Sequence, residues 1–152
     1  YAALKDDYLH CKSWSPPPPG ARGFVKFDEY ADIGALEERK RLDMFASQLR
    51  AQPTMRGYII AYGGRRSRRL EAKDRASCAK NYLIKHQGIE RRRLVIVNGG
   101  YREHAATELH IRLKPGNLPP TSPALDPSEI RIIKGSWRKD RRSLCRLLQS
   151  KV

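Results

Sequence analysis

The sequence predicts an α/β fold, a two-layer sandwich in which two helices pack on a four-stranded sheet. Strand-like and helix-like segments alternate from about residue 23 to residue 115, in the order β-α-β-α-β-β. Proline-rich stretches bound this region on both sides. Helices that cross from one strand to the next imply at least one parallel strand pairing and place the helices on a face of the sheet.

The first strand and helix are predicted by a change in apolar spacing. Residues 23–30 (GFVKFDEY) form a strand-like run, and Asp32 can serve as a turn or as the cap of the helix that follows. Apolar residues then recur at helical spacing from Leu36 to Leu49. The helix is expected to end at Gln52, because Pro53 disfavours helical backbone at the residue before it.

The second half of the domain repeats this alternation. Residues 58–62 (YIIAY) predict a strand that ends at Gly63 and Gly64, and a second helix is expected from about Arg68 to His86. Gly88 is a plausible C-cap for that helix.

Two further strands complete the predicted sheet. Residues 93–98 (RLVIVN) are expected to form the third strand, ending at Gly99 and Gly100. Residues 108–113 (ELHIRL) alternate apolar and polar side chains, which predicts a fourth strand paired as a hairpin with its neighbour.

Segments of different composition flank the domain of residues 23–115. Residues 1–22 contain the run Ser-Pro-Pro-Pro-Pro-Gly, which favours an extended spacer. Residues 116–152 begin as a second proline-rich linker and end in a basic, amphipathic helical tail. The tail could lie on the sheet, bind a partner or fray, and its spacing does not choose between these outcomes.

The charge of the chain is strongly positive. The 31 Lys and Arg residues outweigh 16 Asp and Glu, which gives a net charge of +15. Most of the excess falls on residues 58–93 and 126–152. Arg is the commoner of the two basic residues, and its planar fork binds carboxylates and phosphates through two hydrogen bonds. The composition therefore favours an anionic partner.

Cysteine and histidine spacing predicts no metal site and no cofactor. The three cysteines are not spaced as CxxC, and the four histidines are scattered. Cys11 and Cys145 lie outside the central domain and could pair in an oxidising compartment. Cys78 falls within the second predicted helix, where we expect a small buried or half-buried side chain.

The order of these motifs resembles the OmpA-like C-terminal domain, the peptidoglycan-associating module of bacterial envelope proteins. The likeness covers about ninety residues, from Phe24 to Leu113. Two features carry the likeness. One is the strand with its glycine turn at 58–64, and the other is the Arg-Ala pair in the second helix, followed by apolar residues at helical spacing. The residues after the turn that match in order are Asp74-Arg75-Ala76, Ala79, Leu83, Gly88-Ile89, Arg93 and Gly99-Gly100-Tyr101.

The resemblance implies a non-catalytic binding module of the periplasm. In that family an Asp in the turn binds the ammonium of diaminopimelate, and an Arg in the second helix binds its carboxylate. Arg75 stands at the family's Arg position, whereas Arg65 stands where the Asp would be, after Gly63 and Gly64 in place of His and Thr. A pocket with Arg at both positions is expected to repel ammonium groups and to attract carboxylates or phosphates.

The turn itself has the properties of an anion site. Its glycines let the backbone approach a ligand, and a helix that begins there would present free N–H groups. An alternative is a solvated loop whose arginines pair with Glu71, Asp74 or Glu90. The ligand-binding residues that we predict are Gly63, Gly64, Arg65, Arg66, Arg68 and Arg75.

We therefore expect a binding or assembly module of the cell envelope, with peptidoglycan or an acidic envelope protein as its partner. An envelope location implies a signal peptide that has been removed or that precedes this sequence. Nucleic-acid binding is the alternative, because Tyr62, Tyr82 and Tyr101 lie among arginines, and aromatic side chains can stack on bases. No catalytic constellation or transmembrane segment is legible. The oligomeric state stays open.

Overall fold

The structure of the chain is a computed structural model that describes residues 25–112, 119–140 and 142–149. The predicted N-terminal spacer of residues 1–22 and the start of the second linker lie outside the described residues. Among the residues that are described, no helix is long and apolar enough to cross a membrane.

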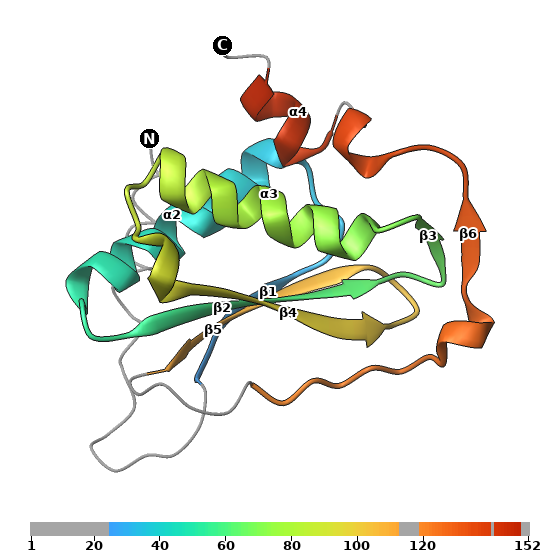
Figure 1. Ribbon diagram of the computed structural model, residues 1–152, viewed down its shortest axis with the longest axis horizontal. Helices are drawn as coiled ribbons and strands as arrows, with labels where there is room; N and C mark the ends of the chain where they lie inside the picture. Colours follow the sequence, from blue (N-terminus) through green and yellow to red (C-terminus); the bar gives the residue numbers. More distant parts are fainter. Residues whose placement is uncertain (1–24, 113–118, 141, 150–152) are drawn as a thin grey trace, which may run out of the picture.

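The fold is mixed α/β, with helices on one face of a four-stranded sheet (Figure 1). The sheet order is β1-β5-β2-β4; β2 and β4 run parallel, and β5 is antiparallel to both of its neighbours. The α/β class and the four-stranded sheet predicted from the sequence are thereby confirmed. The elements of this layer are β1 (Val25–Tyr30), α2 (Ala35–Ala51), β2 (Arg56–Gly63), α3 (Glu71–Lys85), β4 (Leu94–Tyr101) and β5 (Ala106–Arg112).

The predicted hairpin between the last two strands is wrong. β5 does not pair with β4, which it follows, but enters between β1 and β2. Although β5 alternates apolar and polar residues in sequence, its polar residues Glu108 and His110 are both buried. Arg102 covers them from the β4–β5 loop, donating a 2.6 Å hydrogen bond to Glu108, which in turn lies 2.9 Å from His110. A polar residue in the sequence of β5 therefore marks a paired buried group, not a solvent-facing one.

Two other predicted boundaries shift for tertiary reasons. The second helix begins at Glu71, not near Arg68, because residues 66–68 form the short strand β3 (Arg66–Arg68). β4 continues through its glycines to Tyr101, with a bulge in its register opposite β2. Gly99 is required there because a Cβ atom would lie 2.5 Å from the ring of Tyr62.

The main core lies between the sheet and the helices. Leu42, Phe45 and Leu49 from α2 pack with Ile59 from β2 and Leu83 from α3, and all five are fully buried. Burial of apolar surface on this scale is the main driving force for the fold. A second, smaller cluster covers the opposite face of the sheet and contains Tyr58, Ile60, Tyr62 and Val97.

The C-terminal segment packs on the domain and adds a second small sheet. β6 (Arg131–Ile133) pairs in parallel with β3, and α4 (Leu144–Gln149) lies against α2 and α3 (Figure 1). Trp137 and Leu144 of this segment are buried in the main core cluster. The sequence left open whether the tail lies on the sheet, binds a partner or frays. Its described part instead packs on the helices α2 and α3.

A buried carboxyl group in the core predicts a pH-dependent stability. Glu38 on α2 is buried, accepts a 2.7 Å hydrogen bond from the hydroxyl of Tyr30, and has its pKa raised above 4.5 chiefly by burial. Folding therefore favours the protonated form of Glu38. Its contribution to the free energy of unfolding is fully present below the ordinary pKa and is lost as pH rises through the raised pKa. Chemical unfolding from pH 4 to 8 should show a flatter pH profile for Glu38→Gln than for the parent. The exposed neighbour Glu37→Gln serves as the control and should keep the parental profile.

Candidate functional site

The two glycines of the predicted turn serve packing. Gly63 ends β2 and is buried, and a Cβ atom there would lie 2.8 Å from two carbons of the Tyr101 ring. A Cβ atom on Gly64 would lie 3.0 Å from the backbone nitrogen of Ala105. Both positions therefore need glycine because the chain that follows β4 crosses close to them. They do not line the charged cavity described below.

Arg66 and Arg68, which follow these glycines, lie on the strand β3 and not at the start of a helix. β3 pairs with β6 through the register Arg66 with Arg131 and Arg68 with Ile133. α3 begins only after Leu70, whose backbone is left-handed with φ 60° and provides no side-chain cap. The sequence predicts that the arginines surround the first N–H groups of this helix. That placement is wrong, because residues 66–68 form a strand and the helix begins at Glu71.

Arg75 is the centre of the candidate site. Its residue is only 8% exposed, and its guanidinium lies 3.2 Å from the carboxylate of Glu71 and 3.0 Å from that of Asp32. The guanidinium carbon lies 4.9 Å from the ring centroid of Trp137, a cation–π geometry. Two carboxylates and an aromatic face thus compensate a guanidinium that has lost most of its contact with water.

A small charged cavity opens beside this guanidinium. It has a volume of about 170 Å³, and we call it the charged pocket. Of the predicted ligand-binding residues it brings together Arg66, Arg68 and Arg75, but not Gly63, Gly64 or Arg65. The residues that line it are Asp32, Arg66, Arg68, Glu71, Arg75, Ile133, Trp137, Asp140 and Arg142.

Arg65 is directed to a different partner. It forms an exposed ion pair with Glu103 in the β4–β5 loop, with nitrogen–oxygen distances of 2.9 to 3.0 Å. Hydrogen bonding to Arg65 lowers the pKa of the Glu103 carboxyl group. Arg65 is thus occupied in an ion pair on the surface.

Carboxylates balance the arginines of the charged pocket, contrary to the expectation of a purely cationic site. Arg68 lies 2.9 Å from Asp140, and Arg142 lies 3.1 Å from Asp32. The pKa of Asp140 is lowered by the backbone N–H of Arg142 and then by Arg68. Four guanidinium groups face three carboxylates. Such a lining can bind the ammonium and the carboxylate of one zwitterion.

The ion pairs expected of a solvated loop are not found among the described residues. Glu71 pairs with Arg75 of α3, Asp74 with Arg138 and Glu90 with Arg92, so none of these carboxylates forms an ion pair with an arginine of the turn. Arg66 is exposed and forms no ion pair with any residue that the structure describes. Its guanidinium is therefore available to a ligand at the mouth of the pocket.

Four residues of the pocket were missed as site residues because they are remote in sequence. The sequence offers Asp32 as a turn or helix-cap residue, or as a carboxylate that pairs with nearby arginines, and in the structure Gly34 takes the N-cap position without a side-chain hydrogen bond. Trp137, Asp140 and Arg142 belong to the C-terminal segment, whose docking cannot be deduced from its spacing. The cluster of acidic residues at 28–32 was the one sequence feature that indicated a role for Asp32 beside arginines. In the structure Asp28, Glu29 and Asp32 each pair with an arginine.

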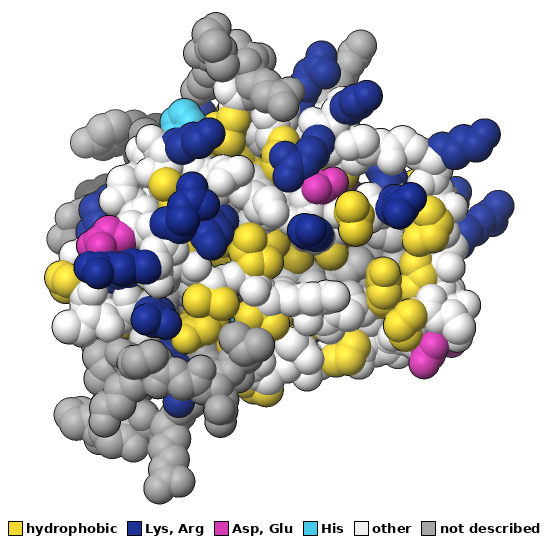
Figure 2. All heavy atoms as spheres, viewed as in Figure 1, with side chains coloured by type: hydrophobic (Ala, Val, Ile, Leu, Met, Phe, Trp, Pro, Cys, Tyr) yellow, Lys and Arg dark blue, Asp and Glu magenta, His cyan; other side chains and the backbone are white. Residues whose placement is uncertain are grey.

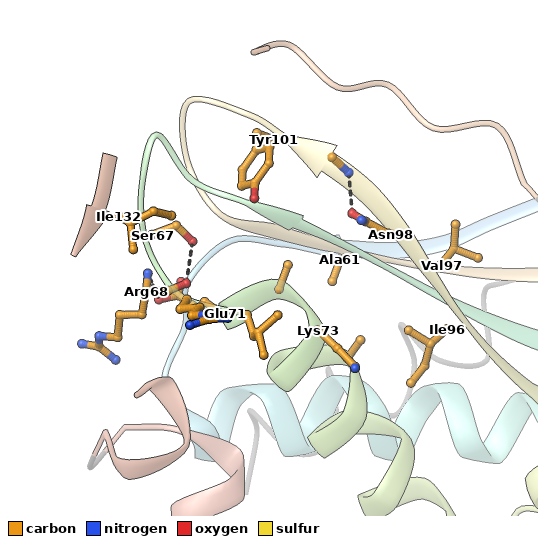
Figure 3. Close-up of a pocket in the computed structure, with 15 residues that line it drawn as sticks. Ala61, Ser67, Arg68, Glu71, Lys73, Ile96, Val97, Asn98, Tyr101 and Ile132 are labelled. Carbon is orange, nitrogen blue, oxygen red and sulfur yellow. Dashed lines mark hydrogen bonds between the residues drawn. The ribbon is translucent and has the colours of Figure 1, made fainter. Parts of the chain in front are cut away.

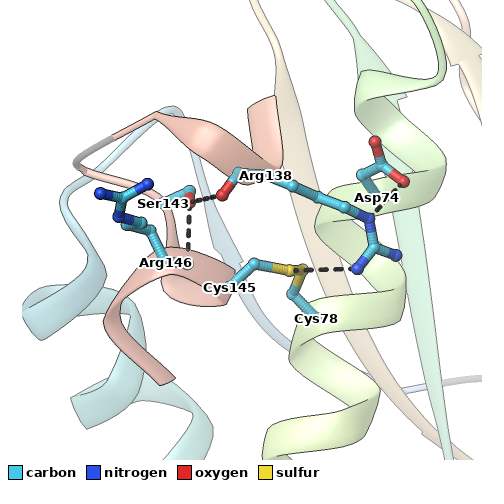
Figure 4. The surroundings of a disulfide bond; sticks show 6 residues. All are labelled: Asp74, Cys78, Arg138, Ser143, Cys145 and Arg146. Atoms are coloured by element: carbon cyan, nitrogen blue, oxygen red, sulfur yellow. Dashed lines mark hydrogen bonds and ion pairs between the residues drawn. A yellow bond between two sulfur atoms is a disulfide. The ribbon is translucent and has the colours of Figure 1, made fainter. Parts of the chain in front are cut away.

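A disulfide bond fixes the C-terminal side of the pocket. Cys78 on α3 is bonded to Cys145 on α4, with Cα atoms 5.3 Å apart (Figure 4). The pairing of Cys145 with Cys11, which the sequence left open, does not form, because Cys145 is bonded to Cys78. Cys11 lies outside the described residues. Arg138 reaches across the same junction and donates a 2.9 Å hydrogen bond to Asp74 (Figure 4). The bond holds α4 close to the helix that carries Arg75.

Comparison with family models, with curated proteins and with solved structures finds no match to this chain. Within the described residues, no group of three or more His, Cys, Asp or Glu side chains is arranged to hold a metal ion.

Removal of the disulfide should destabilise the fold and loosen the pocket. The bond closes a loop of 67 residues, and such cross-links stabilise proteins by about 2–4 kcal/mol. We expect Cys78→Ser with Cys145→Ser to lower the free energy of unfolding by about that amount. In a Trp14→Phe background, emission from Trp137 should shift to longer wavelength as its buried ring becomes solvated.

The control for this variant is Cys11→Ser, which should leave both readouts unchanged. Equal stability of the double variant and the parent would contradict the assigned disulfide.

Proposed function

We propose that this chain is a non-catalytic binding module of the bacterial cell envelope that holds a zwitterionic end group in the charged pocket. The peptidoglycan stem peptide, through its diaminopimelate residue, is the ligand that fits best. The observation that carries the proposal is the ion pair between Arg75 and Asp32, 3.0 Å apart at the wall of a cavity.

The two partners of this ion pair are exposed to different degrees. The side chain of Arg75 is 9% exposed, whereas that of Asp32 is 47% exposed. A ligand can therefore place its ammonium on Asp32 from the solvent side and its carboxylate between Arg75 and the exposed Arg66. Asp32 would thus take the role that the turn Asp has in the OmpA-like family, although it comes from the loop after β1.

Two further features support an envelope module. The strands of the main sheet and their two crossover helices follow the order β-α-β-α-β-β that the OmpA-like resemblance implies. The disulfide between Cys78 and Cys145 favours an oxidising compartment, because thiols are kept reduced in the cytosol. Both agree with a periplasmic location.

Binding to purified cell walls tests the proposal. Asp32→Asn removes the partner of the ligand ammonium, and Arg66→Ala removes a partner of its carboxylate. A hydrogen bond to a charged group contributes about 1.5–3 kcal/mol, so each change should weaken co-sedimentation with diaminopimelate-containing walls by about tenfold or more. Walls whose stem peptides carry lysine in place of diaminopimelate should bind weakly, because lysine lacks the zwitterionic end.

The matched controls are Glu90→Gln and Lys40→Ala, at exposed positions that do not line the pocket. Circular dichroism checks that all variants remain folded. Retention of the Asp32 and Arg66 variants at the level of these controls, or equal retention on both kinds of wall, would reject the proposal.

Nucleic-acid binding is the second candidate, and the charge of the surface is the observation that favours it. Figure 2 shows many Lys and Arg side chains and few Asp or Glu on the face that carries α3. The aromatic part of the argument is reduced to the half-buried Tyr101, because Tyr62 and Tyr82 are buried and cannot stack on bases. The contribution that remains is mainly electrostatic and independent of sequence.

Salt dependence distinguishes this second candidate. If the protein binds duplex DNA through phosphates, the logarithm of its affinity should fall with the logarithm of salt concentration, with a slope of about −0.9 per phosphate contacted. Fluorescence anisotropy with a labelled duplex measures this slope. No binding at low salt, or an affinity that salt leaves unchanged, would eliminate the electrostatic mode.

A further inference from the structure

A second cavity lies on the other side of α3 from the ion pairs of Arg75, and its walls are mainly apolar. It has a volume of about 320 Å³, in the range of ligand-binding pockets, and we call it the apolar groove (Figure 3). Ala61 of β2, Ala72 and Ala76 of α3, and Ile96 of β4 form its walls. It shares only Arg68 and Glu71 with the charged pocket.

Large apolar side chains stand exposed at the mouth of this groove. Leu70 is 59% exposed and Ile132 is 60% exposed, and both line the cavity. Leu70 also has the one positive φ angle among the non-glycine residues that the structure describes. This conformation is unfavourable for a bulky side chain, and strain of this kind concentrates at binding sites.

The groove borders the open edge of the main sheet. β4 is the outermost strand, and its hydrogen-bonded neighbour in the sheet is β2 alone. In the described part of the chain, only its last residue, Tyr101, forms a further bridge, to Leu125. The sequence Leu-Val-Ile-Val-Asn at 94–98 carries none of the lysines or prolines that commonly block edge strands. This edge is therefore able to accept another strand.

The charge around the groove selects the kind of occupant. Arg68, Arg69 and Lys73 line it, and the only acidic residue in its lining, Glu71, is buried and paired with Arg75. A second copy of the chain would bring another net charge of +15 to this surface, so self-pairing is opposed by repulsion. The charge complement of the groove is an acidic segment.

From these features we propose that the apolar groove and the edge of β4 bind an extended, acidic segment of a partner protein. The segment adds to β4 as a strand, so its backbone groups pair with the open edge of the sheet. Its apolar side chains enter the groove beside Ile96 and Ala72, and its carboxylates face Arg69 and Lys73. This site is separate from the charged pocket and does not depend on the proposed function.

Fluorescence anisotropy with the labelled octapeptide Glu-Thr-Ile-Thr-Glu-Thr-Ile-Thr, in which glutamate and isoleucine lie on the same face of a strand, tests the proposal on the full chain. We expect saturable binding of this peptide. A peptide with lysine for glutamate should bind at least about tenfold more weakly, because it places like charges together. A third peptide, N-methylated at alternate residues, keeps the acidic side chains but cannot form a strand ladder and should also lose at least about tenfold.

Paired charge reversals provide the protein-side test. Arg69→Glu with Lys73→Glu should weaken binding of the acidic peptide by at least about tenfold. Lys40→Glu with Lys85→Glu makes the same change in net charge at exposed positions outside the groove and should have little effect. Ala72→Phe, which fills the groove, should abolish binding while circular dichroism and thermal unfolding show an intact fold.

Several results would overturn the proposal. They are failure of the acidic peptide to bind, equal affinity for the N-methylated peptide, and equal loss in the two charge-reversal pairs. Sedimentation equilibrium gives a further check: a dimer of the parent that Ala72→Phe dissociates would show that a second copy occupies this edge.

Discussion

The buried guanidinium of Arg75 is the constraint around which the candidate site is organised. A charge that is only 8% exposed requires compensation, and Arg75 receives it from Glu71 on its own helix and from Asp32 after β1. Trp137 of the C-terminal segment lies against the same guanidinium. One side chain therefore ties together three parts of the chain that are far apart in sequence. The charged pocket lies where these three parts meet.

The C-terminal segment is as much a part of this site as the main sheet. The pairing of β3 with β6 places Ile133 beside the arginines, and the disulfide fixes α4 to α3. Between these two attachments the chain supplies Trp137, Asp140 and Arg142 to the pocket. Ligand binding in the charged pocket is therefore expected to depend on the disulfide, because loss of the bond frees one wall of the pocket.

Sequence reasoning predicted the local elements well because they depend on apolar spacing. The strands and both helices lie close to their expected positions. The C-cap of α3 is His86, and Gly88, the predicted cap, follows two residues later with φ +70°. What it missed depends on distant contacts: the central place of β5, the strand formed by residues 66–68, and the pairing of Cys78 with Cys145. Arg75 was found through a resemblance, while Asp32 could be placed opposite it only in three dimensions. Likewise, no local pattern distinguishes Arg66, which forms no ion pair with any described residue, from Arg65, which is paired with Glu103.

The most direct measurement of the central claim is the NMR signal of the Arg75 side-chain Nε–H group during titration with meso-diaminopimelate. The account predicts a saturable shift of this signal, with the Arg92 signal unchanged and no comparable response to Nα-acetyl-lysine amide, which carries an ammonium but no zwitterionic end. An Arg75 signal that stays in place, or one that moves equally with Nα-acetyl-lysine amide, would contradict the assignment of the charged pocket as a zwitterion site.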